Sequence, residues 1–262
     1  TTPRIISKIE NMDGVNNIDE IIDVSDGIMV ARGDMGVEIP FEQIPAIQKE
    51  IIEKGYMSGK QVITATQMLE SMITNLRPTR AEITDVANAI YDGTSAIMLS
   101  GETAAGKHPV EAVKTMALIA ETTEKDINYI ARLSKRPMQK GIDSTNAIAH
   151  AAVTTAHDLG AKAVITVTKS GSTAKNISKY RPTCMIIGCT PDDTVHRQMS
   201  LSWGVVPVKM DEKSSTDELF SAAIDAAKGH GLVEENDIVV ITAGIPLGVA
   251  GKTNMLKVDT IK

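Results

Sequence analysis

Cysteine is scarce in this sequence, and the two cysteines present cannot form a disulfide within their own segment. Cys184 and Cys189 are five residues apart in an apolar run that predicts a buried strand. An odd spacing places their side chains on opposite faces of such a strand, about 16 Å apart, beyond the reach of a disulfide. Free cysteines suit a reducing compartment, so we expect a cytoplasmic protein.

Long apolar runs and an excess of positive charge are also absent. No run approaches the roughly 20 apolar residues that a membrane-spanning helix needs, and the N-terminus lacks the pattern of a signal peptide. Lysine and arginine total 27 against 33 aspartates and glutamates, a net charge of −6, so the chain has no basic footprint for nucleic acid. The five histidines show no metal-ligand spacing. We expect neither a membrane nor nucleic acid as a partner.

The 262 residues are 42% hydrophobic and 23% charged, a composition typical of a globular protein with one large domain or two smaller ones. Over about the first 120 residues, β-rich runs alternate with helical ones. Periodicity predicts helices over 40–58 and 79–91 and a long helix that begins at Pro109. The predicted strands are RIISKI, GIMVA, QVITAT and SAIMLS. Alternation of this kind implies a parallel sheet.

A polar stretch, SKRPMQKGIDST at 134–145, is the best candidate for a linker. A second series of strands and helices follows it, so we place a domain boundary at 135–142 and expect domains over 1–135 and 142–262. The strands of the second series are AVITVT, CMIIGC, GVVPVK, DIVVIT and NMLKVDTI. With helices between them, these strands predict a three-layer α/β/α domain.

The first series is too short for a closed barrel. A (β/α)8 barrel needs eight strand–helix units in about 250 residues, and only four are predicted here. The chain also does not begin with methionine. We therefore expect the second half of a (β/α)8 barrel, as a fragment of a longer polypeptide whose N-terminal half lies outside this sequence.

Polar side chains follow all four predicted strands of the first domain. Lys8 and Glu10 lie two residues apart where the first strand meets its loop, so both project from one face. Asp34 lies just past the second strand among glycines, Thr66 ends the third strand, and Ser100 ends the fourth. Because the carboxyl ends of parallel strands share one rim, we expect these side chains to converge.

A lysine beside carboxylates is suited to phosphoryl or enolate chemistry. Mg²⁺ bridges oxyanions, while the ammonium neutralises charge that develops in the transition state. Taken alone, Lys8 and Glu10 also fit an ordinary surface ion pair. The convergence of all four strand ends favours a catalytic site over that interpretation.

The motifs also resemble those of a known family. The runs ISKIEN, GIMVARGDMGVEIP, QVITATQMLESMI, RPTRAE and DVANAIYDGTSAIMLSGETAAGKHPVEAV closely resemble pyruvate kinases in order and spacing, and the resemblance continues to the end of the chain. It covers strands five to eight of that family's barrel and its C-terminal domain. The resemblance implies transfer of a phosphoryl group from phosphoenolpyruvate to ADP, which yields pyruvate and ATP in the final step of glycolysis.

The resemblance also assigns roles at the rim. Lys8 would stabilise the transferred phosphoryl group and the enolate, with Glu10 and Asp34 as ligands of Mg²⁺ or Mn²⁺. Thr66 would contact the substrate on the protonation side of the enolate, and Ser100 would belong to the proton relay. The turn that binds the substrate carboxylate, through the amides of its last two residues, would consist of Ala31, Arg32, Gly33 and Asp34.

A second candidate site follows the first strand of the second domain. Hydroxyls, one cation and a glycine at a helix start predict a phosphate cradle, formed by Thr168, Lys169, Ser170, Gly171, Ser172 and Thr173. The same residues also fit a well-capped helix. By the family resemblance this loop binds a sugar-phosphate activator, or AMP, in allosteric pyruvate kinases. The glycine-rich loop with Gly248 and Gly251 would close on that ligand, and Trp203 would stack nearby.

Two other functions remain open from the sequence. One is a non-catalytic fragment that binds a sugar phosphate or takes part in assembly. The other is a metal-dependent lyase or aldolase acting on a pyruvate enolate, which the TQMLESM segment and the second domain disfavour. For a pyruvate kinase, the family implies K⁺ besides the divalent cation and a homotetramer of the full-length protein. Since half of the rim lies outside this sequence, we expect the chain alone to be inactive.

Overall fold

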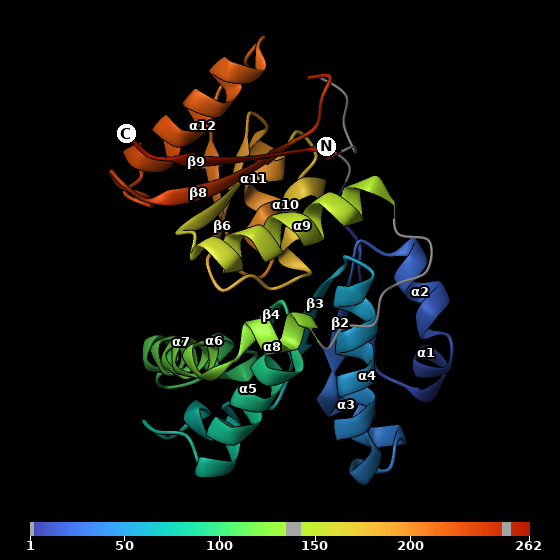
Figure 1. Cartoon of the computed structure of the whole chain (residues 1–262). Coiled ribbons are helices and arrows are strands. Elements are labelled where there is room, and N and C mark those ends of the chain that lie inside the picture. The colour runs from blue at the N-terminus through green and yellow to red at the C-terminus, as the bar shows by residue number, and fades with distance from the viewer. Residues whose placement is uncertain (1–2, 135–142, 248–252) are drawn as a thin grey trace. The chain divides into compact units, whose positions relative to one another are not determined.

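The computed structural model describes residues 3–134, 143–247 and 253–262, and the chain divides into two compact units, Thr1–Ile127 and Asn128–Lys262. The domain boundary predicted at 135–142 lies outside the described residues. Figure 1 labels most of the elements of both units along the chain.

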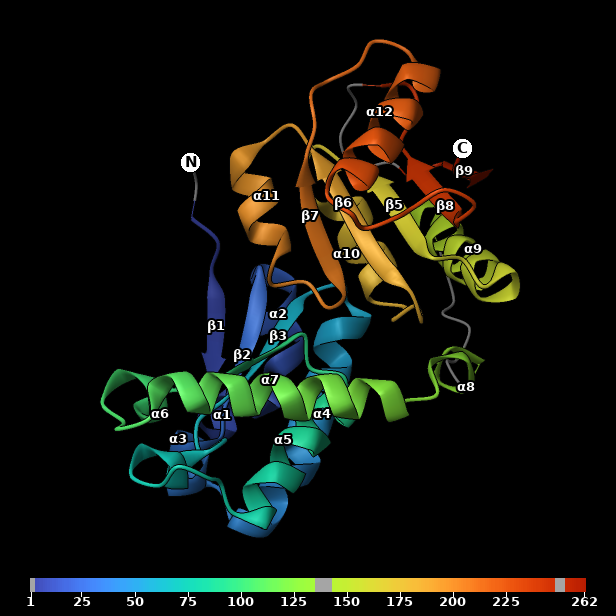
Figure 2. The same ribbon diagram turned by 90° about the vertical axis from the view of Figure 1, so that its left-hand side faces the viewer.

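The first unit contains one sheet of four parallel strands in chain order (Figure 2). The strands are β1 (Ile6–Ile9), β2 (Gly27–Ala31), β3 (Gln61–Ala65) and β4 (Ala96–Met98). The helices that follow them in turn are α1 (Met12–Asn16), α2 (Ile18–Val24), α3 (Arg32–Glu38), α4 (Ile44–Met57), α5 (Arg80–Asp92), α6 (Gly101–Ala104) and α7 (Pro109–Asp126). Short 3₁₀ turns lie at Phe41–Gln43 and Glu70–Ile73. The predicted parallel α/β arrangement is confirmed.

The core of the first unit lies between one face of this sheet and its helices. Ile28, Val30 and Val62 are fully buried among side chains of α2, α3 and α4. A neighbouring core joins α5 to α7. Met29 and Ile63 project to the other face of the sheet, because side chains alternate along a strand, and both are partly exposed.

Local signals set the helix ends in this unit. The helix predicted over 79–91 is α5, which begins with a capping box between Thr79 and Glu82. It ends at Gly93, whose φ of 100° is left-handed and therefore suits a residue without a Cβ. The long helix predicted from Pro109 is α7, with Pro109 in its first turn.

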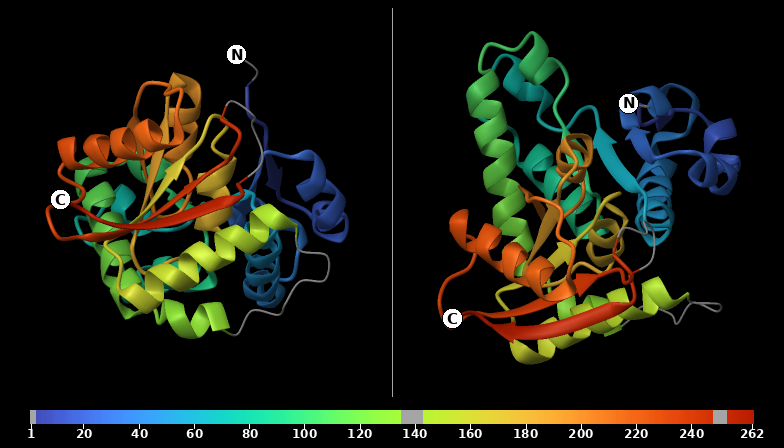
Figure 3. Two further views of the ribbon diagram at one scale, coloured as in Figure 1. Left: turned by 45° about the horizontal axis from the view of Figure 1, so that its top comes forward. Right: turned by 90° about the horizontal axis from the view of Figure 1, so that it is seen from above.

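The second unit contains a five-stranded sheet in the order β7-β6-β5-β8-β9. Its strands are β5 (Ala163–Val167), β6 (Met185–Thr190), β7 (Val205–Lys209), β8 (Ile238–Ala243) and β9 (Met255–Thr260). The strands are parallel except β9, which runs antiparallel to β8 (Figure 3). The helices of this unit are α8 (Tyr129–Ser134), α9 (Ser144–Leu159), α10 (Ser172–Ser178), α11 (Asp193–Met199) and α12 (Thr216–Gly229).

Both faces of the second sheet are covered. One hydrophobic core packs α12 against one face, and another packs α9 and α10 against the opposite face. The two cysteines lie on opposite faces of the sheet: Cys189 belongs to the core with α12, whereas Cys184 packs against the core with α9 and α10. Both are free, as expected, and burial raises the pKa of Cys184 to about 11 and that of Cys189 to about 12. The three-layer architecture is confirmed.

Helix α8 packs with the second unit, although residues up to 135 were expected in the first domain. Leu133 is buried in the core formed by α9 and α10. The ring of Tyr129 lies 5.3 Å from the ring of Trp203, which precedes β7. Packing against the second core therefore decides where this helix belongs, a contact that the polarity of the following stretch did not reveal.

Neither a membrane span nor a multi-ligand metal group is found in the parts of the chain that the structure describes. No helix there is long and apolar enough to cross a bilayer. No three side chains among the described His, Cys, Asp and Glu gather as a metal site. A cation bound in these parts would therefore rely on one or two carboxylates and on other ligands.

Candidate active site

Lys8, Glu10 and Asp34 meet at the carboxyl ends of β1 and β2. The ammonium of Lys8 lies 2.6 Å from Oε2 of Glu10 and 2.8 Å from Oδ2 of Asp34. Parallel pairing of β1 with β2, in which Lys8 is opposite Met29, brings the two segments together. The hydrogen bonds to Asp34 and Glu10 raise the pKa of Lys8 to about 12. The predicted convergence of a lysine with two carboxylates is present in the structure.

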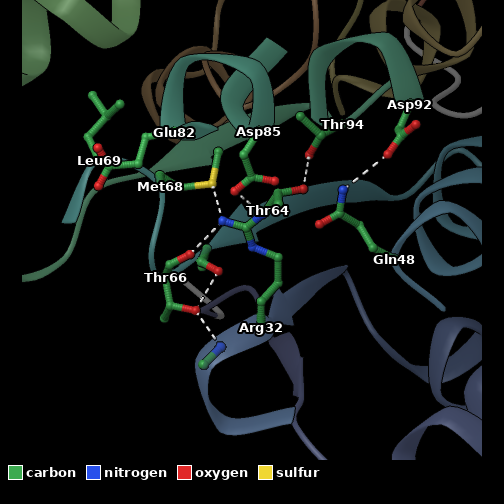
Figure 4. Close-up of polar contacts among 12 residues, drawn as sticks. Arg32, Gln48, Thr64, Thr66, Met68, Leu69, Glu82, Asp85, Asp92 and Thr94 are labelled. Atoms are coloured by element: carbon green, nitrogen blue, oxygen red, sulfur yellow. Dashed lines mark hydrogen bonds and ion pairs between the residues drawn. The ribbon is translucent and has the colours of Figure 1, made fainter. Parts of the chain in front are cut away.

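The turn after β2 is joined to the turn after β3 (Figure 4). Ala31 and Ala65 are opposite each other at the ends of these strands. Just beyond them, the amide of Gly33 donates a hydrogen bond to Oγ1 of Thr66 at 2.7 Å. A Cβ at Gly33 would lie 3.3 Å from that oxygen, so glycine permits the close approach.

Thr66 and Gln67 adopt a left-handed backbone conformation that is uncommon for residues with side chains. Their φ angles are 68° and 54°. Oγ1 of Thr66 donates to the carbonyl of its neighbour Ala65 at 2.6 Å, while it accepts from Gly33. Strain of this kind persists where surrounding contacts hold it, and it concentrates at functional sites.

Arg32 supplies one of those contacts. Its guanidinium donates to the carbonyl of Thr66 at 2.7 Å and contacts the sulfur of Met68 at 2.8 Å. The same group forms a 2.6 Å ion pair with Asp85 on α5. The Arg32 side chain is only 9% exposed, so it is committed to holding this turn and is not extended into solvent (Figure 4).

Ser100 and the turn after β3 are joined through a buried carboxylate. Glu102 is 2% exposed and accepts hydrogen bonds from the amide of Ser100 at 2.8 Å and from the amide of Leu69 at 3.0 Å. It therefore links the loops that follow β3 and β4. Glu102 lies in the first turn of α6, and its buried carboxylate stabilises both loops.

Two residues of this network were not singled out by sequence reasoning. Asp85, the partner of Arg32, is 53 residues away along the chain, and the only signal was its place in a helix that follows a capping box. Glu82 closes that capping box and also accepts hydrogen bonds from the amide and hydroxyl of Ser71. Although burial raises the pKa of Glu82, these hydrogen bonds and those from Thr79 lower it overall.

A cavity of about 450 Å³ lies between α4 and α5, next to this network. Arg32 and Asp85 line it together with Gln48 and Asp92, whose side chains share a 3.0 Å hydrogen bond. Lys8 and its two carboxylates are not among its lining residues. The cavity therefore borders the supports of the Thr66 turn, not the lysine–carboxylate group.

The loop after β5 forms the second candidate site. The amide of Gly171 donates to Oγ1 of Thr168 at 2.9 Å, and the hydroxyls of Ser170 and Ser172 are 2.8 Å apart. Gly171 has a left-handed φ of 79° and precedes α10. The ammonium of Lys169 forms a 2.6 Å ion pair with Glu212. The predicted hydroxyls, glycine and cation are thus grouped in one loop.

The partner loop of this site is described only at its end. Gly248 and Gly251 lie outside the described residues. The hydroxyl of Thr253 lies 2.8 Å from that of Thr173, so the chain returns next to the start of α10. Trp203 is elsewhere: its carbonyl accepts from Ser178 at the other end of α10, and its ring stacks with Arg181 and Tyr129. The structure does not bring Trp203 to the loop.

Four parallel βα units with a lysine, carboxylates and hydroxyls at their carboxyl ends define the first unit as part of a βα-barrel protein of the catalytic type. The family model "Pyruvate kinase, barrel domain" matches residues 1–113, and "Pyruvate kinase, alpha/beta domain" matches residues 146–259. The chain belongs to the pyruvate kinase family.

Individual relatives agree with the family assignment. The chain is 55% identical over 259 residues to a pyruvate kinase of Clostridium acetobutylicum, covering 99% of this chain and 55% of that relative. It is 55% identical over 258 residues to a pyruvate kinase of Sporosarcina psychrophila, covering 98% of this chain and 44% of that relative. A crystal structure of a pyruvate kinase from Cryptosporidium parvum superimposes with a TM-score of 0.92 at 45% identity, covering 99% of this chain and 52% of that one. The chain spans about half the length of these relatives.

Proposed function

We propose that this chain supplies half of the active site of a pyruvate kinase, which transfers the phosphoryl group of phosphoenolpyruvate to ADP and yields pyruvate and ATP. The observation that carries the proposal is the meeting of Lys8 with Glu10 and Asp34 at the strand ends. In this role Lys8 binds the transferred phosphoryl group and neutralises the enolate charge that develops as the bond breaks.

The two carboxylates fit a divalent cation. Their oxygens lie within 2.6 and 2.8 Å of one point, now the Lys8 nitrogen, so both reach a single cation. Mg²⁺ takes oxygen ligands and is commonly held by one or two carboxylates plus substrate oxygens and water. We propose Glu10 and Asp34 as ligands of Mg²⁺ or Mn²⁺, which would supply positive charge to the substrate oxyanions. A requirement for K⁺ is proposed from the family.

The substrate carboxylate is proposed to bind the turn after β2. The amides of Gly33 and Asp34 are its proposed donors, and the amide of Gly33 would exchange its present hydrogen bond to Thr66 for one to the substrate. Ala31 and Arg32 complete the turn. Thr66 is in hydrogen-bond contact with Gly33 and is therefore suited to contact the same ligand on its protonation side. Ser100 is proposed as a member of the proton relay, held by Glu102.

The second unit is proposed to bind an anionic effector, a sugar phosphate or AMP, at residues 168–173. The grouped hydroxyls and Lys169 support this proposal. Gly248 and Gly251 are proposed to close on the effector. Hydrophobic cores cover both faces of this unit's sheet, which supports a fold that stands by itself, and a non-catalytic binding role is the second candidate function.

We propose that the enzyme acts in glycolysis in the cytoplasm as a homo-oligomer, a tetramer by analogy with the family. Four of the eight strand ends of a barrel lie in this chain, so these 262 residues alone are expected to show no useful turnover.

The proposed activity is tested by joining the chain to the N-terminal half of the Clostridium acetobutylicum relative. The joined protein is expected to turn over at about 10 s⁻¹, the usual median for enzymes. Lys8→Met should lower its kcat by about 10³ or more, because the lost charge acts in the transition state. Lys54→Met, which removes another lysine from the same unit, is the control and should leave kcat unchanged. A loss below tenfold for Lys8→Met would remove Lys8 from the catalytic role.

A further inference from the structure

Lys8 occupies the point at which Glu10 and Asp34 converge. Its ammonium is 2.6 Å from one carboxylate oxygen and 2.8 Å from the other. The two carboxylates come from different elements, one directly after β1 and one in the first turn of α3. In the described parts of the chain, Lys8 is the cation in the ion pairs of both carboxylates.

A divalent cation ligated by both of these oxygens would take the place of the Lys8 ammonium. Mg²⁺ binds oxygen at about 2.0–2.1 Å, and a cation that ligates both carboxylates would lie close to the present position of the Lys8 nitrogen. Two positive charges in such contact repel strongly near a protein surface. The ammonium of Lys8 would then have to move away from a cation bound in this way.

We propose that Lys8 and the divalent cation exchange at this carboxylate pair: binding of the cation displaces the ammonium of Lys8 and makes it available to the anionic substrate. The proposal rests on the metal ligands proposed above and goes beyond them, since it makes the lysine the internal competitor of the metal. Lys8 then has two successive partners, first the carboxylates and afterwards the substrate oxyanion.

The mobility of Lys8 makes the exchange feasible. Its side chain is 46% exposed, and a lysine carries its charge on a flexible four-carbon stem. Arg32, just past the end of β2, is the opposite case, because its side chain is 9% exposed and its guanidinium is held by three contacts. The site thus combines a cation that can move with one that is fixed.

Thermodynamic reciprocity follows from the exchange. If the metal releases Lys8 for an anion, then an anion that takes up Lys8 must raise the affinity for the metal by the same factor. Metal and anionic substrate therefore bind with positive cooperativity, although neither needs to change the backbone.

The chain contains a matched control for this arrangement. Lys54 also lies between two carboxylates, 3.0 Å from Asp19 and 3.1 Å from Glu50. Its side chain is 34% exposed, and both acidic partners lie on helices of the same unit. No metal ligand is proposed there, so the two lysines differ in the feature under test.

The first test measures binding of Mn²⁺ to the full chain by the electron paramagnetic resonance signal of free Mn²⁺. Lys8→Met should raise the affinity about 3- to 30-fold, the range expected from removing two competing surface ion pairs. Lys54→Met should leave it unchanged, and Glu10→Gln and Asp34→Asn should each lower it. Circular dichroism checks that all variants are folded.

The second test uses the unaltered chain and a water-soluble carbodiimide, which joins an amine to a carboxylate in contact with it as an amide. In metal-free buffer, peptide mapping should find Lys8 joined to Glu10 or Asp34, and Lys54 joined to Asp19 or Glu50. Mg²⁺ should suppress the products of Lys8 and leave those of Lys54 unchanged, whereas NaCl at equal ionic strength should affect neither.

The outcomes separate the two proposals. If Mn²⁺ binding depends on Glu10 and Asp34 but Lys8→Met does not strengthen it, the exchange is wrong and the metal site stands. Equal suppression of both sets of crosslinked products by Mg²⁺ would also overturn the exchange. If Glu10→Gln and Asp34→Asn leave Mn²⁺ binding unchanged, the metal ligands of the proposed function are wrong, and the exchange falls with them.

Discussion

The two units of this chain solve the same problem, burial of a parallel sheet, in different ways. In the second unit, hydrophobic cores cover both faces of the sheet, and β5, β6 and β8 are almost completely buried. In the first unit, the described cores include the side chains on the sheet face that packs against helices. Met29 and Ile63, on the opposite face, are partly exposed.

The comparison shows where each unit places its core and where it places its candidate site. Parallel sheets are normally covered on both faces, and a barrel achieves this by turning one face inward against the other strands. The first unit leaves positions on one face of its sheet partly exposed and brings the proposed active-site residues together at strand ends. The second unit has its core within itself, and its candidate ligand loop lies outside that core.

The largest expected difference concerns independent folding. Residues 128–262, expressed alone, should melt in one cooperative transition, because both faces of their sheet are covered. Residues 1–127 alone should bind a hydrophobic dye and melt without a sharp transition, as partly ordered states do. Calorimetry and dye fluorescence check this, and two equally cooperative melts would contradict the comparison.

The next difference concerns core side chains. Ile165→Ala in β5 should cost about 2–5 kcal/mol of unfolding free energy, since the side chain is fully buried and leaves a cavity. Ile63→Ala in β3 should cost about 1 kcal/mol, because its side chain is only partly buried. Urea titrations measure both. Trp203, the only tryptophan, reports the second unit, and circular dichroism reports both. Equal losses at the two positions would remove the distinction between the faces.

A ligand should stabilise one unit and not the other. Fructose 1,6-bisphosphate at 100 times its Kd should add about 2.7 kcal/mol to the stability of the second unit, followed by Trp203 fluorescence. Lys169→Glu should abolish the gain, because it replaces attraction to phosphate by repulsion. Lys162→Glu, at the opposite end of β5, is the control. If neither this ligand, a pentose phosphate nor AMP shifts the melt, the loop is only a helix start.

The smallest effect expected is the pH dependence that Glu82 gives to the first unit. The pKa of Glu82 is lowered in the fold, so its contribution to stability is present above the unfolded pKa of about 4.5 and is lost as the pH falls through the folded value. Glu82→Gln should cost about 0.5–2 kcal/mol at pH 7, the range of a lost helix cap, and progressively less below pH 4. Glu218→Gln near the start of α12 is the matched control. A pH-independent loss would assign the effect to packing.

The sequence predicted most elements because their signals are local. Strands such as GIMVA and QVITAT are short and apolar, and α5 carries both a capping box and a terminal glycine. The strand ends also predicted the meeting of Lys8 with Glu10 and Asp34, since the direction of parallel strands fixes where their ends lie. The packing of α8 with the second unit depends on tertiary contacts of Leu133 and Tyr129, which no local signal shows.

The supports of the site could not be predicted in the same way. Thr66 and Gln67 are left-handed without being glycine or asparagine, and only the contacts around them hold that conformation. Arg32 was expected to complete the substrate turn, and the structure adds that its side chain is paired with Asp85, a partner distant in sequence. Trp203 lies at the wrong end of α10 for the predicted stacking, because Arg181 and Tyr129 hold its ring.

Glu102 has a consequence for how this protein can vary. Its two hydrogen bonds go to main-chain amides, those of Leu69 and Ser100, and every amino acid except proline offers such an amide. Substitutions of Leu69 or Ser100 by any residue except proline therefore leave the two amides in place for these hydrogen bonds. The buried carboxylate of Glu102 thus holds the two loops together through their main chain, independently of the side chains that these loops carry.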